Sequence, residues 1–397
     1  MATDDAARRA RYRATFGSAC LVIHEATHSV RVWSDPFGLL ITAAVLGACG
    51  TGRDASHASA SASVMPGPGP LARPNATAAN AACEGCHAEA AVTWRASLHA
   101  RAWSDPVFQR SFLEEPATFC RNCHAPETGA PALGVACVTC HDPAGTGVVL
   151  ASAPTPAARG PAPHRVLRDP GFAGDRACAS CHEFAFPDAA QRDDPTARMQ
   201  RTISEHAASR FADRTCASCH MPKGTHGGRS HGFEVASDPA MLRRALVAQV
   251  TRTDESVVFD LAPGEVGHAF PTGDLFRRLV LTAEVVGEDY QLVAHAVHAL
   301  ARHFRFEAGA HGGKFQRELS DDRVQGGPQQ VEIRIGPQAR GQAIRWRIEW
   351  QRVQSMHEEH AVIADTVVVA EGRLPPQSPG RVDHTTQTPE GRLGASR

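Results

Sequence analysis

The sequence predicts two regions of different class: a mostly irregular and α-helical domain over residues 81–246, followed by an antiparallel β-sandwich-like domain over residues 247–374. Two observations carry this prediction. Five Cys-x-x-Cys-His units lie before residue 221, and they contain ten of the 12 cysteines. The β-branched and aromatic runs that follow contain no cysteine. We therefore expect only the first domain to be organised around the repeated unit.

The repeated unit has the same spacing in every copy. Cys-x-x-Cys-His is typical of c-type haem attachment, in which two thiols add to the vinyl groups of one haem and the His binds its iron. The sequence thus predicts five covalently bound c-type haems as core material, wrapped by a chain with few long elements. The copies are Cys83, Cys86 and His87; Cys120, Cys123 and His124; Cys137, Cys140 and His141; Cys178, Cys181 and His182; and Cys216, Cys219 and His220.

Zinc is the alternative ligand of such pairs. Zinc ribbons use Cys-x-x-Cys at moderate spacing, and some include His. A ribbon gives no reason for His directly after every second cysteine. Since His accounts for 21 of 397 residues, five such coincidences are roughly a one-in-a-million event under independent placement. The pattern favours haem over zinc.

The amino-acid composition indicates how the first domain is filled and which class of binding partner is not expected. Aromatic residues make up 6% of the chain, and there are 34 Gly and 27 Pro, so large side chains alone do not fill the first domain. The formal net charge of -1 gives no argument for a nucleic-acid partner, and we expect none.

The N-terminal segment 1–49 has the features of an export signal. Residues 37–48 form an apolar run that is too short to span a bilayer and has the length of a signal-peptide core. Leu46-Gly47-Ala48-Cys49-Gly50 resembles a bacterial lipobox, which predicts a lipid on Cys49; ordinary signal cleavage nearby is the alternative. Covalent haem attachment takes place outside the bacterial cytoplasm. We expect an exported protein, periplasmic or anchored to the outer membrane as a lipoprotein.

The segments that flank the two domains are simpler. The basic stretch Arg8 to Arg13 and Cys20 lie too far ahead of the apolar run, which suggests that translation begins near Val30 or Val32. Residues 50–80 are rich in Ala, Ser, Gly and Pro and predict a flexible tether. Residues 375–397 predict a disordered tail.

Local patterns predict the elements of both domains. Residues 88–101 and 197–211 indicate helices, whereas residues 142–177 indicate a long loop. In the second domain, short runs separated by Gly-rich and Pro-rich turns indicate strands. These runs are 257–261, 279–286, 331–335, 344–350 and 366–370.

The second axial ligand of each iron decides between a pure electron carrier and a substrate-binding haem. Histidines outside the attachment units exceed the five that are required, while Met is scarce, which suggests bis-His ligation and low potentials. Position selects the candidates: two lie beside attachment units, one lies in the long loop, one of two follows the last unit, and one lies in a turn leading into the sheet domain. They are His99, His206, His164, His231 (or His226) and His268.

Three groups of segments in the first domain carry a resemblance to a known family. They are Cys83-Glu-Gly-Cys86-His87 with Trp94 and Ser97-Leu98-His99-Ala100, Cys120 to Pro126 with Gly134-Val135-x-Cys137, and Glu205-His206 ahead of Cys216 to Pro222. They resemble multihaem cytochromes related to the tetrahaem cytochrome c-554 of nitrifying bacteria, and Gly267 to Gly273 resembles a segment common in large bacterial multihaem cytochromes. The resemblance implies bis-His haems packed at near contact, with His99, His206 and His268 as cross-ligating residues. The chain departs from it in having five units rather than four, and in its appended sheet domain.

These features predict a periplasmic or membrane-anchored pentahaem cytochrome that transfers electrons between a donor and an acceptor redox protein. The C-terminal domain is expected to dock it in a multiprotein electron-transfer complex. The alternative is a multihaem reductase or oxidase of a small nitrogen or sulfur compound, with one open axial site. Ammonia-forming nitrite reductases share the haem count but place Lys at the active haem, and hydroxylamine-oxidising relatives need a cross-linking Tyr. No unit here ends in Lys, and the mature chain has only Tyr290, so we favour the carrier and assign no catalytic residue.

Overall fold

The structure is a computed structural model, and its described residues all belong to one unit, Ala60–Arg397. The signal and lipobox segment, the start region, His226 and the tail from residue 377 lie outside these residues, as does the tether up to residue 68. The described ranges are 69–114, 116–152, 162–186, 197–224, 228–233, 238–273, 275–287, 289–308, 314–354 and 361–376.

The first domain is built from short helices, and the repeated unit is itself one helical turn. Residues at i and i+3 share a helix face, so this turn aims both cysteines of a unit the same way. The helices are α2 (Ala76–Cys86), α3 (Ala88–Ala96), α4 (Pro106–Glu114), α5 (Cys120–His124), α6 (Cys137–His141), α7 (Arg176–His182), α8 (Thr202–Ala207) and α9 (Cys216–His220), with 3-10 turns at Pro131–Leu133 and Pro170–Ala173. Because α2 begins at Ala76, the predicted tether ends earlier than expected.

Three sequence predictions in this domain were wrong in detail. The helix over 88–101 ends at Ala96, because Ser97 is extended and its hydroxyl bonds the Trp94 carbonyl at 2.6 Å, so His99 lies in a turn. The loop over 142–177 contains β1 (Val148–Ala151) paired in parallel with β2 (Arg165–Arg168). The helix over 197–211 is replaced by β4 (Arg198–Arg201) and then α8, since β4 pairs with β3 (Glu183–Ala185).

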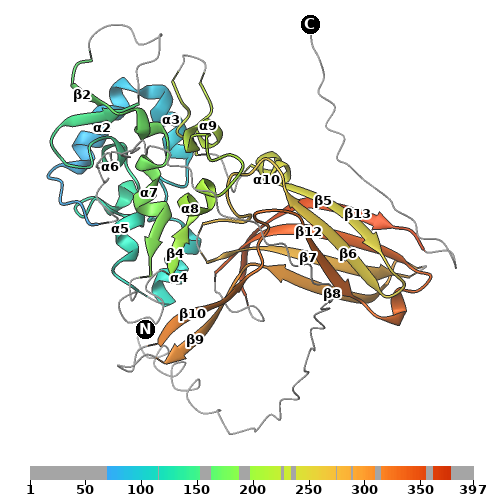
Figure 1. Cartoon of the computed structure of the whole chain (residues 1–397). Coiled ribbons are helices and arrows are strands. Elements are labelled where there is room, and N and C mark those ends of the chain that lie inside the picture. The colour runs from blue at the N-terminus through green and yellow to red at the C-terminus, as the bar shows by residue number, and fades with distance from the viewer. Residues whose placement is uncertain are drawn as a thin grey trace, which may run out of the picture. The chain divides into compact units, whose positions relative to one another are not determined.

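The second domain consists of two antiparallel sheets that share one core (Figure 1). The core takes Phe259 from one sheet and Leu281, Ile344 and Ile348 from the other, all fully buried. The predicted runs are confirmed as β6, β7, β11, β12 and β13. One sheet has the order β11 (Gln329–Arg334), β6 (Ser256–Pro263), β5 (Leu246–Arg252), and the other the order β13 (Ile363–Leu374), β12 (Ala343–Val353), β7 (Arg277–Val286), β8 (Leu292–Leu300), with α10 (Pro239–Arg244) before β5.

A hairpin outside the two sheets joins the domains. It is formed by β9 (Arg302–Ala308) and β10 (Lys314–Asp321). Arg302 donates to the carbonyls of Arg198 and Met199 in β4, at 2.6 and 2.7 Å. A second junction is the ion pair of Arg352 with Asp105, at 2.7 Å.

No helix in the described part of the chain is both long enough and apolar enough to cross a membrane.

The core predicts a matched pair of stability changes within one sheet. Leu281 in β7 is 0% exposed, whereas Leu292 in the neighbouring strand β8 is 53% exposed. Leu281→Ala should lower the free energy of unfolding by about 2–5 kcal/mol, because it leaves a cavity. Leu292→Ala should change it by less than about 1 kcal/mol. Denaturant unfolding followed by far-UV circular dichroism measures both, and equal losses would contradict the assignment of the core.

Candidate metal centres built from paired histidines

Four motif histidines each face the ring of a second histidine that comes from a distant part of the chain. The four second rings are those that the sequence proposes as axial ligands. The pairs and their ring-centre separations are His87 with His164 at 6.4 Å, His182 with His99 at 6.4 Å, His141 with His231 at 6.1 Å, and His220 with His268 at 6.2 Å.

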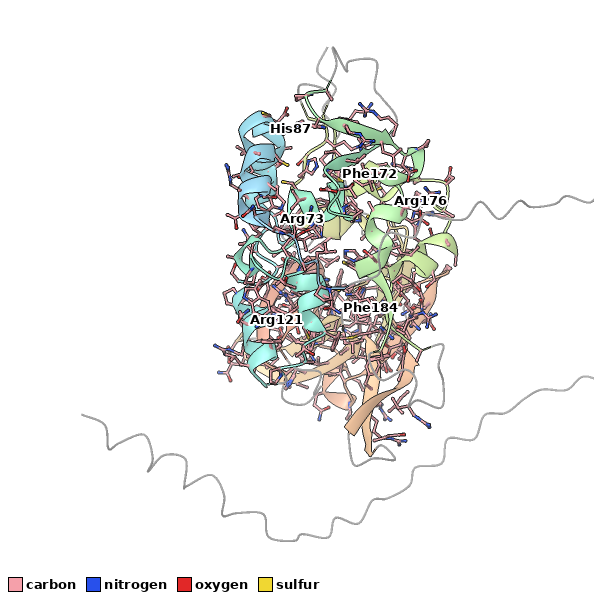
Figure 2. The ribbon with its side chains drawn as sticks, turned by 90° about the vertical axis from the view of Figure 1, so that its left-hand side faces the viewer. Arg73, His87, Arg121, Phe172, Arg176 and Phe184 are labelled. Carbon is pink, nitrogen blue, oxygen red and sulfur yellow. The ribbon has the colours of Figure 1, made fainter. Side chains whose placement is uncertain are left out.

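Local structure holds two of the second rings in place. His164 directly precedes β2, so the pairing of β1 with β2 carries it to His87, which Figure 2 shows between the blue helices and the green strands. The turn that carries His99 is closed by the backbone N–H of Val135, which donates to the His99 carbonyl at 2.8 Å.

The other two second rings are held by loops. The backbone N–H of His231 donates to the hydroxyl of Thr93 in α3 at 2.9 Å. His268 lies between β6 and β7, inside the sheet domain, whereas the sequence placed it in a turn leading into that domain.

Hydrogen bonds fix which ring nitrogen is available to a metal. Where Nδ1–H donates to a backbone carbonyl, the ring is oriented and Nε2 is left for coordination. His99 differs from the rings that are bonded in this way, because its Nδ1 is buried and has no hydrogen-bond partner. That nitrogen is satisfied if it is itself the metal-binding atom. The carbonyl-bonded rings are His124 to Ala102 at 2.9 Å, His141 to Leu150 at 2.8 Å, His231 to Arg229 at 2.9 Å and His268 to Ala269 at 3.0 Å.

Burial keeps the rings of His99 and His268 in the neutral form that binds metals. Burial first, and then the neighbouring charges of His182, His124, His220 and His231, lower the pKa of His99 to about 3. Burial is also the largest cause that lowers the pKa of His268 to about 4.

The ring separations fit an iron bound on both sides by imidazole. Metal–imidazole bonds of about 2.0 Å, with each ring centre about 1.1 Å behind its nitrogen, place two ring centres about 6.2 Å apart. The observed separations run from 6.1 to 6.4 Å. Across the described ranges, no three His, Cys, Asp or Glu side chains gather as a site for a metal ion held by protein ligands alone. The residues therefore fit c-type haem.

Two predicted ligands have other surroundings. His124 stacks on Phe108, with ring centres 3.8 Å apart and planes 9° apart, and this contact covers the ring face but not its edge. His206 in α8 lies against Gly267, where a Cβ would come within 2.9 Å of its Cδ2. No ring contact joins His206 to a motif histidine within the described residues, so its role as a ligand stays a prediction.

Sequence reasoning missed Phe233. Its ring lies 4.1 Å from the ring of His99 and 6.0 Å from that of His231, edge-on to both. Its backbone has φ 47°, which is uncommon for a residue other than Gly. A lone Phe after His231 gives no periodic signal, and only the folded chain shows that it contacts the rings of two candidate ligands.

Contacts between cysteines of different Cys-x-x-Cys-His units show which of these units are neighbours in space. The thiols of Cys123 and Cys181 lie within hydrogen-bonding reach, as do those of Cys178 and Cys216. After burial, the nearest thiols raise two further pKa values, that of Cys140 beside Cys181 to about 12 and that of Cys137 beside Cys83 to about 11. The fourth unit thus adjoins the second, third and fifth.

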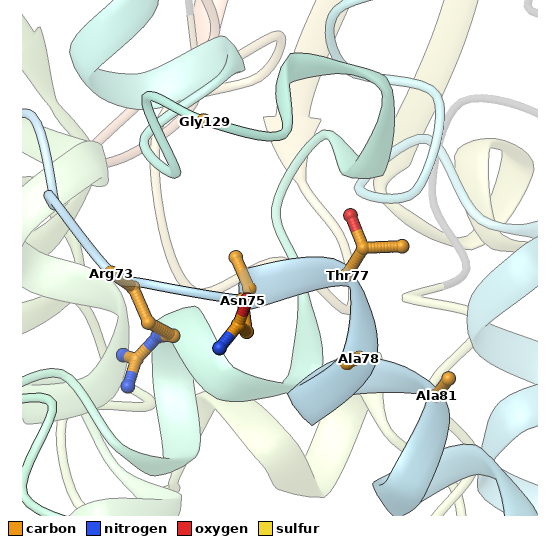
Figure 3. A pocket seen from close by; sticks show the side chains of 7 residues that line it. Arg73, Asn75, Thr77, Ala78, Ala81 and Gly129 are labelled. Carbon is orange, nitrogen blue, oxygen red and sulfur yellow. The ribbon is translucent and has the colours of Figure 1, made fainter.

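A surface hollow of about 470 Å³ lies apart from these rings, at the start of α2 (Figure 3). It is lined by Arg73, Asn75, Thr77 and small residues. The Arg73 guanidinium is already engaged by Glu127 at 3.3 Å and Asp142 at 2.9 Å. The hollow therefore brings no metal ligand to the paired rings.

Comparison with known proteins shows the fold. No family model and no curated protein matches the sequence. The structure is similar to the crystal structure of a penta-haem cytochrome c552 from Thermochromatium tepidum, with a TM-score of 0.55 and 20% identity over 74% of this chain and 97% of that one. A looser match is MtrC from Shewanella baltica OS185, with a TM-score of 0.16 and 13% identity over 51% and 32% of the two chains. The chain thus shares its fold with a multihaem c-type cytochrome.

The turn that carries His99 predicts that alanine substitutions at two nearby glycines have different effects on stability. Gly134 has φ +60°, and a Cβ there would lie 2.4 Å from the His99 carbonyl oxygen, whereas Gly129 has open space around it. Gly134→Ala should destabilise the protein by more than about 1 kcal/mol, since both the backbone angle and the contact are unfavourable. Gly129→Ala should be nearly neutral. Thermal unfolding of the two variants measures this, and a neutral Gly134→Ala would show that the turn is not held as described.

Proposed function

We propose that this protein is a pentahaem c-type cytochrome that transfers electrons along closely packed bis-histidine haems. The observation that carries the proposal is the set of four histidine pairs, separated by 6.1 to 6.4 Å, each with one ring from a Cys-x-x-Cys-His unit. The similarity in fold to a penta-haem cytochrome supports it.

Each side chain has a defined task in this proposal. The ten cysteines anchor the haems, and the five motif histidines are their proximal ligands. His164, His231, His99 and His268 are the distal ligands of the first, third, fourth and fifth haems. His206 stays a candidate for a distal ligand. Bound haem supplies reversible ferric–ferrous chemistry, and the protein sets the ligands, the spacing and the burial.

The order of the units makes the array branched. Cys83 of the first unit lies near Cys137 of the third, and Cys140 of the third lies near Cys181 of the fourth. The second and fifth units both adjoin the fourth through their cysteines. His99 is accordingly close to His124 of the second unit, to His220 of the fifth unit and to His231, the proposed second ligand at the third unit. The fourth unit is the junction, and the first, second and fifth are the ends.

The location and partners follow from the segments that flank the haem domain. The signal and lipobox features place the protein in the periplasm or at the outer membrane, with a lipid on Cys49 as the anchor. Donor and acceptor are redox proteins. The domain over 247–374 provides a docking surface for a multiprotein electron-transfer complex.

Spin state tests this proposal against an enzyme that binds a small nitrogen or sulfur compound. We expect five haems per chain from the pyridine haemochromogen assay and intact mass. The electron paramagnetic resonance spectrum of the oxidised protein should contain only low-spin signals, because the proposal gives every iron two strong ligands, with His206 as the candidate at the second haem. Carbon monoxide should leave the optical spectrum of the reduced protein unchanged. A high-spin signal together with carbon monoxide binding would favour the enzyme.

The branched order predicts different effects of removing two distal ligands. His99→Ala acts at the junction, and His164→Ala makes the same change at an end. Neighbouring charged centres interact, so His99→Ala should alter the potentials or resonance signals of three further haems. His164→Ala should alter the potential or resonance signal of only one further haem. Redox titration followed by resonance spectroscopy counts the affected haems, and equal counts would exclude a junction at the fourth unit.

A further inference from the structure

The backbone beside His268 is held by the sheet domain on one side. The Nδ1–H of His268 donates to the carbonyl of Ala269 at 3.0 Å. The same peptide group donates its N–H, that of Phe270, to the Val324 carbonyl at 2.8 Å, and Val324 donates back to Phe270 at 3.0 Å. The group that orients the His268 ring is therefore itself fixed by the segment that follows β10.

On the other side, a buried carboxylate from the first domain holds the same loop. Glu205 in α8 accepts the backbone N–H of Ala269 at 3.3 Å and the hydroxyl of Thr272 at 2.6 Å. Its side chain is only 7% exposed. Burying an ionised carboxylate is costly unless it is paired with an opposite charge.

Arg323 supplies that charge and bonds the loop directly. Its guanidinium donates to Glu205 at 2.6 Å, to the Pro271 carbonyl at 3.0 Å and to Asp321 at 2.8 Å, and its side chain is 3% exposed. Burial alone opposes its charge, but the bond to Asp321 and the charge of Glu205 raise the pKa of Arg323. Arg201 in β4 completes the network through Asp321 and Glu318.

We propose that Arg323 and Glu205 are positioning residues for His268, through which the sheet domain sets the strength of the axial bond that this ring makes. The inference rests on the proposed function, in which His220 and His268 share the fifth iron. Neither residue is a ligand. Arg323 acts on His268 through Glu205 and through the backbone of residues 269–271. Removing its guanidinium therefore removes part of the support for the Ala269 carbonyl, to which the His268 ring is hydrogen-bonded.

Arg323→Met tests this in the full-length, haem-loaded protein. Groups that orient metal ligands typically change metal affinity about 10- to 100-fold when removed. We expect the ratio of reduced to oxidised fifth haem, at a fixed potential, to change by about tenfold, which is 59 mV for one electron. The resonance signal of that haem should shift or gain a high-spin component, while the other four stay as in the unchanged protein.

Three further variants make the result specific. His268→Ala identifies the signals of the fifth haem, since it removes the ligand itself. Arg352→Met is the matched control, because it breaks a different Arg–carboxylate contact between the domains, the pair with Asp105 at 2.7 Å, which does not touch the loop around His268. Arg323→Lys should restore the spectrum only in part, as Lys lacks the planar fork that reaches several acceptors.

The outcomes separate the two proposals. If His268→Ala leaves every haem unchanged, the assignment of the fifth pair fails, and the proposed function with it at that site. If His268→Ala acts but Arg323→Met leaves the fifth haem unchanged, the positioning role is overturned. The same holds if Arg323→Met and Arg352→Met disturb all haems alike, since that is loss of folding and not positioning.

Discussion

The fixed separation of two imidazole rings is the constraint on which the first domain depends. In the proposed cytochrome, ring centres about 6.2 Å apart leave room for one iron between the two imidazole nitrogens, so the chain has to hold both rings at that spacing. In each of the four pairs, the second ring comes from a turn or loop. The short helices, the parallel pair β1–β2 and the loop between β6 and β7 are the means of holding those rings at that spacing.

The sheet domain and the attachment units could be predicted from sequence because their signals are local. Alternation of apolar and polar residues decides which face of a strand is buried, and it marked β6, β7, β11, β12 and β13. The unit Cys-x-x-Cys-His carries its spacing within one helical turn. In neither case did the prediction require knowledge of a distant residue.

The predictions that failed concern segments whose structure depends on distant partners. Residues 198–201 have no strand pattern of their own and become β4 because β3 and Arg302 offer partners for their backbone groups. The helix expected at His99 stops at Ala96, since Ser97 closes it and Gly134 packs against the turn. The position of His99 beside an attachment unit was enough to select it as a candidate ligand. That position could not show which motif histidine the His99 ring lies opposite. Phe233 had no signal at all.

The place of His268 inside the sheet domain has a consequence for maturation. In the proposed cytochrome, the second ligands of the first, third and fourth haems all precede the sheets along the chain. The second ligand of the last unit lies between β6 and β7, and the backbone that holds it pairs with Val324, further along the chain. Under the proposed function, assembly therefore has a direction along the chain, because the fifth haem would gain its second ligand only once the sheet domain has folded.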